Sequence, residues 1–226
     1  MPKAAKPAAK RLSPKERERV ETLFQRFSTL SEDPRTELDF KNPFTLLVAV
    51  ALSAQATDKQ VNKATAPLFE VADNPAAMLA LGEAGLTKYI ASIGLFRTKA
   101  KNVIALSRII QEQHGGEVPL EREALMALPG VGRKTASVVL NELDIEPAIA
   151  VDTHVYRVSH RLKLSKGKTP DQVEADLMRI VPEPYRTRAH HWLILHGRYV
   201  CLARRPKCET CQVSDLCPSR ELFVGG

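Results

Sequence analysis

The chain has 226 residues, enough for one large domain or two small ones that each bury a core. Its 33 Lys and Arg outnumber its 26 Asp and Glu, and the net charge of +7 favours a polyanionic partner, although a basic surface can also serve solubility alone. The longest nearly apolar run, Phe44 to Leu52, is too short to cross a bilayer, which argues against a membrane protein.

The first segment in chain order is basic and poor in side chains that could form a core. Lys, Arg, Ala and Pro dominate residues 1–15, so we predict a disordered basic arm there. Such an arm could contact DNA phosphates without sequence preference, or it could simply remain solvated. Ser13 and Pro14 then form a capping residue and a first-turn proline, which together predict the start of a helix.

Helical periodicity dominates the rest of the chain, and no segment alternates as a half-buried strand does. Leu106, Ile109 and Ile110, for example, follow the i, i+3, i+4 spacing of a buried helix face. Short connections that contain Pro or Gly separate the periodic stretches. We therefore expect an all-α fold, with further helices over 44–54, 76–81, 86–93, 99–113, 121–127, 134–142, 153–162, 169–181 and 188–197.

A glycine-rich turn, LPGVGRKTA at 128–136, lies between two of the expected helices. Gly130 and Gly132 permit backbone conformations that other residues disfavour, and the helix after them begins with unpaired N–H groups. Such a helix start is suited to binding a DNA phosphate, although a Gly-x-Gly turn is often no more than a tight turn. The basic pair Arg133 and Lys134 favours the phosphate interpretation.

All four cysteines lie near the C-terminal end in the pattern C-x6-C-x2-C-x5-C. No apolar signal-peptide core precedes them, so we expect a reducing cytosol and a cofactor site in preference to disulfides. Four thiolates can form either a closed zinc site or an iron–sulfur cluster, and their spacing does not choose between the two. The candidate ligands are Cys201, Cys208, Cys211 and Cys217.

Three cations fall within the loop between the first two cysteines: Arg204, Arg205 and Lys207. A cofactor bound by the cysteines would give this loop a fixed shape and would hold the three positive charges together. We therefore expect the loop to clamp the phosphate backbone of a nucleic acid.

Four motifs, in order along the chain, resemble those of the endonuclease III family of DNA glycosylases. They are LSAQATD at 52–58, LPGVGRKTA at 128–136, AVDTHV at 150–155, and HHWLILHGRYVC at 190–201 with the cysteine array after it. The resemblance covers nearly the whole chain after about residue 16.

This resemblance implies a two-lobed helix-hairpin-helix DNA glycosylase fold with a DNA groove between the lobes. A six-helix lobe over 36–146 would contain the hairpin, and 16–35 together with 147–226 would form the cluster lobe. The resemblance also implies that the four cysteines hold a [4Fe-4S] cluster.

The resemblance further implies that Lys134 is the nucleophile and Asp152 its catalytic partner, facing it from the other lobe. The positive end of the helix dipole and neighbouring Arg133 disfavour a charged ammonium, which suits an amine that attacks the anomeric carbon and forms a Schiff base. Asp152 would then stabilise positive charge on the sugar and help to move protons. Two structural alternatives stay open: an aspartate before Thr153 is a favoured helix cap, and a first-turn lysine is ordinarily solvated or bound to phosphate.

A base within a duplex must be extruded before it can enter a pocket. The resemblance implies that Gln55 fills the gap left in the stack and that Leu95 wedges at the opposite strand. Alternatively, Leu95 is a core residue and Gln55 caps a helix. The chain departs from its close relatives at Phe96-Arg97, where they often have Tyr-Asn, and at Ser137, where they often have Asn.

The remaining expected DNA contacts lie in the basic and glycine-rich segments, except for His154, which is close to Asp152 and would contact DNA or the pocket. They are Arg97, Gly130, Val131, Gly132, Arg133, His154, Arg204, Arg205 and Lys207. His190, His191 and His196 lie near the cysteines, but four thiolates already complete a ligand set, so we expect these histidines to pack within a helix.

We therefore expect a bifunctional DNA glycosylase and abasic-site lyase of base excision repair. Its partner would be double-stranded DNA that contains oxidised pyrimidines or abasic sites, and the chain would act as a monomer in a bacterial cytoplasm, associated with the nucleoid. Two alternatives stay open. A relative that removes adenine from mismatches typically lacks the hairpin lysine and has an extra C-terminal domain, whereas nine residues follow Cys217 here. A non-catalytic hairpin module would only recruit partners to DNA.

Overall fold

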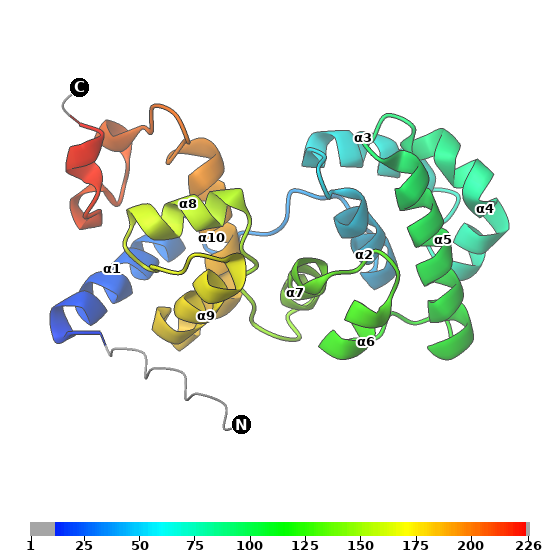
Figure 1. The fold of residues 1–226 in the computed structure, drawn as a ribbon, viewed down its shortest axis with the longest axis horizontal. Helices are drawn as coiled ribbons and strands as arrows, with labels where there is room; N and C mark the ends of the chain where they lie inside the picture. The colour runs from blue at the N-terminus through cyan, green and yellow to red at the C-terminus, as the bar shows by residue number, and fades with distance from the viewer. Residues whose placement is uncertain (1–11, 225–226) are drawn as a thin grey trace, which may run out of the picture. The chain divides into compact units, whose positions relative to one another are not determined.

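The computed structural model describes residues 12–224 and contains helices but no strand within that range (Figure 1). The chain divides into two compact units, Pro34–Ala150 and a second one that joins the segment up to Asp33 with the segment from Val151 onward. The sequence analysis placed these boundaries at 36 and 146. Most of the predicted basic arm, residues 1–11, lies outside the described residues, and a helix already begins at Pro14. None of the described helices combines the length and apolarity of a membrane span.

Six helices form the first unit, which we call the hairpin unit. They are α2 (Pro43–Leu52), α3 (Asp58–Phe69), α4 (Pro75–Ile90), α5 (Phe96–Gln113), α6 (Arg122–Ala127) and α7 (Arg133–Glu142). Side chains define several of their starts: Asn42 accepts from the N–H of Thr45, and Thr57 accepts from the N–H of Gln60.

Helix α2 lies at the centre of the hairpin unit. Leu46, Leu47, Val48 and Ala49 are all fully buried, so α2 has no polar face. A helix that is apolar on every side must be surrounded by other elements, and α3, α5 and α7 pack against it. This arrangement gives the unit a single continuous core.

The sequence analysis predicted no helix between 54 and 76, whereas the structure has helix α3 there, with Pro67 inside it. Pro67 and Lys63, whose carbonyl would have accepted the missing N–H, are both exposed, so water can satisfy that carbonyl. The predicted break between 81 and 86 is present as a bend in α4, where Gly82 takes a φ of 68° that favours glycine.

The second unit, which we call the terminal unit, combines α1 (Pro14–Leu30) with the C-terminal third of the chain. Its other elements are α8 (Thr153–Arg161), α9 (Pro170–Ile180), the 3-10 helix η1 (Glu183–Tyr185), α10 (Arg186–Tyr199), and the 3-10 helices η2 (Cys208–Thr210), η3 (Ser214–Leu216) and η4 (Arg220–Leu222). Phe24 of α1 packs near Trp192 of α10, with the ring centroids 6.5 Å apart. The Trp192 indole N–H also donates to the Ser31 carbonyl, at 2.8 Å.

Candidate functional site

The turn between α6 and α7 is fixed by its glycines and by contact with α5. Gly130 has a φ of 79°, and a Cβ added there would lie 2.8 Å from the Asn102 side-chain nitrogen, so this position requires glycine for conformation and for space. The Val131 side chain is buried, and its N–H donates to the Leu128 carbonyl at 3.1 Å. Val131 therefore anchors the turn from inside.

Arg133 and Lys134 occupy the first turn of α7, and both side chains are exposed. The N-cap residue, Gly132, has no side chain that could cap the N–H groups of that turn. The opposite face of α7, which includes Ala136 and Val139, is buried in the core of the hairpin unit, so the basic pair faces outward. This geometry fits both predicted roles, an anion-binding helix start and an accessible lysine amine.

A guanidinium that the sequence analysis did not identify stabilises the helix pair. Arg122 of α6 donates to the buried Ser137 hydroxyl of α7 at 2.7 Å and pairs with Glu146 at 3.0 Å. Ser137, the position at which the chain departs from its close relatives, thus accepts a hydrogen bond that joins the two helices.

The Gln55 and Leu95 turns lie side by side in the hairpin unit. Gln55 is exposed in the turn after α2, and Leu95 is the N-cap of α5 with 62% of its surface exposed. A Cβ added at Gly94 would lie 3.9 Å from the Gln55 carbonyl oxygen, which shows how closely the two backbones approach. Leu95 is therefore not a core residue, and Gln55 caps neither α2 nor α3.

Arg97 follows Leu95 in the first turn of α5, and its side chain is exposed. Its guanidinium carbon lies 5.5 Å from the centroid of the Phe96 ring, within the range of a cation–π contact. The substituted pair Phe96-Arg97 thus places one positive charge beside the Leu95 turn.

Asp152 lies in the terminal unit and caps helix α8. Its Oδ1 accepts the N–H groups of His154 and Val155, both at 2.8 Å, which is the capping geometry that the sequence left open. Its Oδ2 accepts no hydrogen bond from residues 12–224. His154 is half-buried, and its Nδ1 lies 3.3 Å from the Arg157 guanidinium.

Two arginines of α8, four residues apart, hold the backbone that leads into the cysteine loop. Arg157 donates to the carbonyls of Gly197 and Cys201, at 2.9 and 3.0 Å. Arg161 donates to the carbonyls of Leu202 and Ala203, at 2.6 and 3.0 Å. The sequence analysis missed this pair, although their i, i+4 spacing already placed them on one face of a helix.

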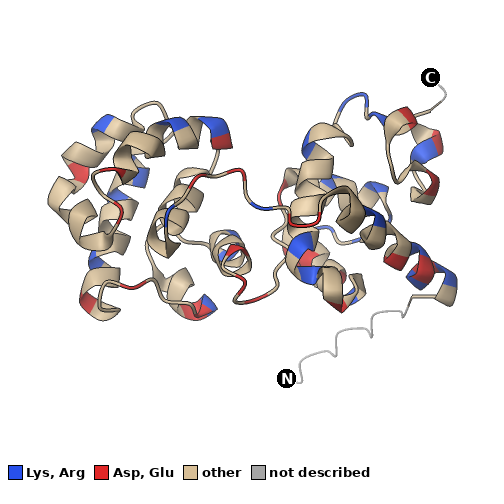
Figure 2. Cartoon of the chain, turned by 180° about the vertical axis from the view of Figure 1, so that it is seen from behind, with Lys and Arg blue, Asp and Glu red and all other residues tan. Residues whose placement is uncertain are grey.

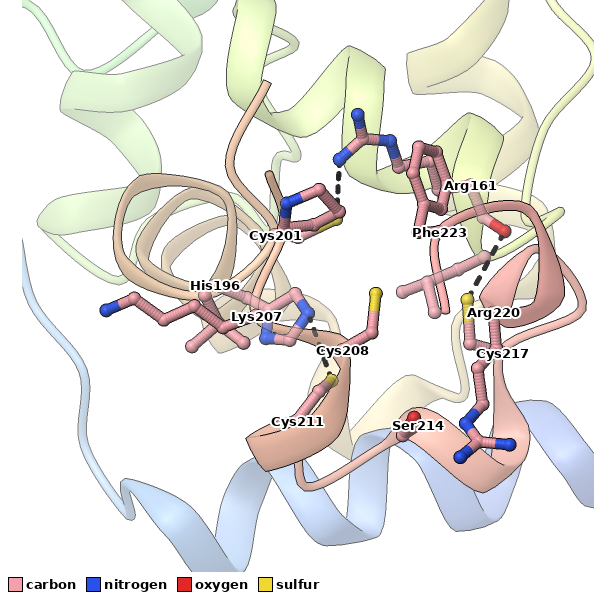
Figure 3. Close-up of a pocket in the computed structure, with 13 residues that line it drawn as sticks. Arg161, His196, Cys201, Lys207, Cys208, Cys211, Ser214, Cys217, Arg220 and Phe223 are labelled. Atoms are coloured by element: carbon pink, nitrogen blue, oxygen red, sulfur yellow. Dashed lines mark hydrogen bonds between the residues drawn. The ribbon is translucent and has the colours of Figure 1, made fainter. Parts of the chain in front are cut away.

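None of the four cysteines forms a disulfide, and all four line a single pocket of the terminal unit (Figure 3). The Cys208 sulfur points into the space between the other three residues. Burial raises the pKa of the Cys211 and Cys217 thiols, and repulsion from neighbouring thiolates adds to the shift. No three metal-binding side chains among residues 12–224 lie close enough to hold one metal ion.

Two further side chains of the pocket, Arg161 and His196, lie next to cysteine sulfurs. The Arg161 guanidinium donates to the Cys201 sulfur at 3.3 Å, so a positive charge lies beside this ligand. Burial lowers the pKa of His196 to about 4, so this ring adds no charge beside Cys211, whose sulfur is 3.9 Å away. The donor set, four partly buried thiols from one loop, therefore fits an iron–sulfur cluster.

The loop from α10 to η2 carries the three predicted phosphate-binding cations, and it is blue for Lys and Arg in Figure 2. Arg204, Arg205 and Lys207 are all exposed, and the Lys207 N–H donates to the Val200 carbonyl at 3.0 Å. The structure thus groups these cations in the terminal unit with Asp152, whereas the hairpin, Gln55 and Leu95 turns belong to the other unit.

Comparison with known proteins gives two family matches. Residues 48–183 match the HhH-GPD superfamily of base-excision DNA repair proteins, and residues 201–217 match the iron–sulfur binding domain of endonuclease III. The second match includes all four cysteines and therefore selects the iron–sulfur interpretation over zinc and disulfides.

Curated relatives and solved structures agree with the family matches. Endonuclease III of Escherichia coli (strain K12) is 57% identical over 188 residues, which cover 83% of this chain and 89% of that protein. Endonuclease III of Rickettsia conorii is 56% identical over 198 residues, 88% of this chain and 94% of that protein. A structure described as a trapped endonuclease III–DNA covalent intermediate has a TM-score of 0.85 and 41% identity, covering 94% of this chain and 99% of that one.

These matches extend over both units and over every motif on which the sequence analysis depended. They confirm the predicted all-α helix-hairpin-helix fold and the [4Fe-4S] cofactor. The chain belongs to the endonuclease III family of base-excision repair enzymes, which are DNA glycosylases with abasic-site lyase activity.

Proposed function

We propose that this chain excises oxidised pyrimidines from duplex DNA and cleaves the strand through a covalent bond between Lys134 and deoxyribose. The observation that carries the proposal is the exposed Lys134 in the first turn of α7, directly after a glycine turn whose N–H groups have no side-chain cap. A phosphate bound at that turn would bring the sugar of the same nucleotide close to the Lys134 amine. The related structure described as a trapped covalent intermediate with DNA supports the same chemistry.

The proposed reaction begins when the unprotonated Nζ of Lys134 attacks C1′ of the damaged nucleoside. A C–N bond forms to the lysine, the glycosidic bond breaks, and the base leaves with a proton. Ring opening then gives a Schiff base. Loss of a proton from C2′ breaks the C3′–O bond, which releases the 3′ side of the strand by β-elimination, and water finally hydrolyses the Schiff base to free the lysine.

Asp152 supplies the carboxylate of the proposed reaction. Its Oδ1 is engaged by the first N–H groups of α8, which fixes the side chain, while Oδ2 is left for a reacting group. We propose that Oδ2 stabilises positive charge on the sugar and accepts a proton during the later steps. One carboxyl can therefore cap the helix and serve catalysis, so the two interpretations of Asp152 are compatible.

The remaining predicted contacts divide into two groups by their chemistry. Gln55 and Leu95, both exposed, would occupy the stack after the nucleotide is extruded, and Arg97 would meet a phosphate beside them. The exposed cations of the loop between the first two cysteines would bind the DNA phosphates without sequence preference; they are Arg204, Arg205 and Lys207. A [4Fe-4S] cluster held by the four cysteines would give that loop a fixed shape.

A nicking assay tests this proposal. Duplexes that contain thymine glycol should be nicked, whereas adenine mismatches should give neither a nick nor free adenine. Lys134→Gln should abolish nicking while lesion-bearing DNA still binds. Lys63→Gln, which removes an exposed lysine of α3 outside the site, is the matched control and should retain activity. Full nicking by Lys134→Gln would refute the nucleophile assignment, and free adenine without a nick would favour the mismatch alternative.

Asp152→Asn separates the two roles of the carboxyl. An asparagine oxygen can still cap α8, so we expect an unchanged unfolding midpoint and a turnover reduced by roughly 100-fold or more. Loss of the fold without a specific loss of turnover would instead leave only the capping role.

We also propose that the chain acts as a monomer on the bacterial nucleoid. Its net charge of +7 supports sequence-independent attraction to DNA. Sedimentation with and without duplex should give one chain per lesion site, and a stable dimer would contradict the proposal.

A further inference from the structure

Two adjacent turns of the hairpin unit hold non-glycine residues in a left-handed backbone conformation. Gln55 has a φ of 57° and Leu95 a φ of 59°. Their backbones approach closely, since a Cβ at Gly94 would lie 3.9 Å from the Gln55 carbonyl oxygen. Such conformations are costly for residues with side chains and persist only where the surroundings enforce them, often at functional sites. Something near these turns must therefore stabilise them.

The Lys99 side chain, in the first turn of α5, contacts the turn that carries Gln55. Its side-chain amine donates to the Leu52 carbonyl at 3.0 Å and to the Ala54 carbonyl at 2.6 Å, which lie at the end of α2 and just before Gln55. The backbone N–H of Lys99 makes the ordinary i, i−4 bond of α5 to the carbonyl of the N-cap residue Leu95, at 3.0 Å. The Lys99 side chain thus joins the end of α2 and the start of the Gln55 turn to the helix that begins at the Leu95 turn.

The position of this amine is not explained by packing alone. Lys99 is only 8% exposed, and burial lowers the pKa of its side chain, so the buried charge carries a desolvation cost. An apolar residue of similar length could fill the same volume without that cost. An apolar side chain could not bind the carbonyl of Leu52, which ends α2 and attracts a cation, or the carbonyl of Ala54 in the turn after it.

We propose that Lys99 is a positioning residue whose side chain holds the Gln55 turn against the first turn of α5, and so keeps the Gln55 and Leu95 turns together in the arrangement with which they enter a duplex. The proposal rests on the proposed function, in which these two side chains occupy the stack. Lys99 itself is buried and contacts neither DNA nor the reacting atoms. Its contribution should therefore be needed for substrates that require extrusion and should be dispensable for those that do not.

Two abasic substrates separate these cases. A duplex with one abasic site requires the protein to enter the stack, whereas a single-stranded oligonucleotide with the same site does not. For Lys99→Met, which keeps the length and removes the ammonium, we expect KM on the duplex to rise about tenfold, the loss typical of one charge-assisted hydrogen bond. Cleavage of the single strand should stay within about twofold of wild type.

Stability is controlled with two further variants of the same helix. Ile110→Ala creates a cavity in α5 far along the helix from Lys99, and it should lower the unfolding midpoint without changing the preference between duplex and single strand. Lys99→Arg keeps the charge and should recover part of the duplex activity. As a spectroscopic measure, 2-aminopurine beside the abasic site should report weaker unstacking by Lys99→Met and normal unstacking by Ile110→Ala.

The outcomes distinguish this inference from the proposed function. If wild type forms no reducible adduct on either substrate, the lysine chemistry fails and the role of Lys99 falls with it. If wild type forms the adduct on both substrates but Lys99→Met loses both equally, or behaves as Ile110→Ala does, the positioning role alone is overturned. A loss confined to the duplex supports both.

Discussion

The hairpin unit and the cysteine segment over 200–224 are stabilised in different ways. In the hairpin unit, six helices bury a continuous set of apolar side chains around α2. In the cysteine segment only Val213 and Ser219 are fully buried, and its helices are 3-10 helices of three residues each. Its backbone is held instead by guanidinium groups from other helices, Arg161 from α8 and Arg19 and Arg26 from α1.

The two regions of this chain therefore keep a fixed backbone in different ways: one by burying apolar side chains, the other by hydrogen bonds from arginine side chains. Burial of apolar surface is sufficient for the hairpin unit, because each helix removes a complete apolar face from water. A segment with so few buried side chains cannot offset the entropy of ordering its backbone by burial alone. We therefore expect the cysteine segment to depend on its cofactor and the hairpin unit to be independent of it.

Removal of one ligand should produce the largest effect. In Cys208→Ala we expect loss of the cluster and of the ordered fold over 200–224, because ligand binding and folding are coupled in such a segment. Limited proteolysis should cut this segment in the variant and spare 34–150, and visible absorbance should report loss of iron. Ser214→Ala, which removes a hydroxyl without a hydrogen-bond partner among residues 12–224, is the control. A protected cysteine segment in Cys208→Ala would contradict the dependence.

A cavity in the core of the hairpin unit tests the expectation that this unit is stabilised by apolar burial and does not depend on the cofactor. Leu106 is fully buried in α5, so Leu106→Ala should lower the free energy of unfolding by about 2–5 kcal/mol. Denaturant unfolding should report this loss, while the iron content per folded chain stays that of wild type. Leu120→Ala, at a position that is 44% exposed, should have a much smaller effect. Loss of iron in Leu106→Ala under native conditions would show that the two regions are not independent.

The same contrast explains how much of the molecule the sequence could predict. Helices with a regular apolar face, such as α5 and α9, were expected within a few residues of their observed bounds. Helix α3 was not predicted; it contains Pro67, a residue that is unfavourable inside a helix, although the helix continues to Phe69. The 3-10 helices were not predicted, because three residues are too few to show a helical period, and the guanidinium groups that bind the carbonyls of Gln212 and Leu216 come from α1, far away in sequence.

Site residues show a similar limit. Motif resemblance identified Lys134, Asp152 and the cysteines because their neighbours form distinctive strings. It gave no indication of Lys99, whose proposed role depends on two hydrogen bonds to carbonyls at the end of α2 and in the turn after it. Backbone carbonyls have no side-chain identity, so a sequence carries no pattern for such contacts.

Replacing Arg161 by lysine tests whether the guanidinium group stabilises the cysteine segment through its charge or through its forked hydrogen-bond geometry. Lysine keeps the charge but cannot reach the Leu202 carbonyl, the Ala203 carbonyl and the Cys201 sulfur together. We expect Arg161→Lys to cost about 1.5–3 kcal/mol, the range for hydrogen bonds to charged groups. Iron release during denaturant unfolding should occur earlier than in wild type. An unchanged release profile would mean that charge, and not fork geometry, holds the segment.

Leu95→Gly tests whether the left-handed backbone conformation of Leu95 lowers the stability of the hairpin unit. Glycine adopts a left-handed conformation freely, whereas a residue with a Cβ pays about 1–2 kcal/mol for it. Since Leu95 is 62% exposed, few buried contacts are lost, and we expect the unfolding midpoint to stay level or rise. Duplex nicking should fall at the same time. A clear drop in the midpoint would mean that Leu95 contributes to packing.

The smallest expected effect concerns a carboxylate of the terminal unit. Burial opposes ionisation of Asp176, but hydrogen bonds from Ser165 and Arg179 dominate and hold the pKa of its carboxyl below the usual value. A lowered folded-state pKa stabilises the fold at pH values above about 3.9, and this contribution disappears as the pH falls through the folded pKa.

Asp176→Asn should therefore cost about 1 kcal/mol at neutral pH and progressively less below about pH 4. Urea unfolding at several pH values measures this difference. Asp39→Asn changes an exposed carboxylate of the hairpin unit and serves as the control. A penalty that stays constant with pH would show that the carboxylate charge is not what stabilises α9.

The most direct measurement of the whole account is borohydride reduction of the iron-loaded chain on a duplex that carries one thymine glycol, followed by peptide mapping of the adduct. The account predicts a single cross-link, through Lys134 in the first turn of α7, and none in Lys134→Gln. A stable adduct through a different residue, or nicking of the lesion strand with no reducible adduct, would contradict it.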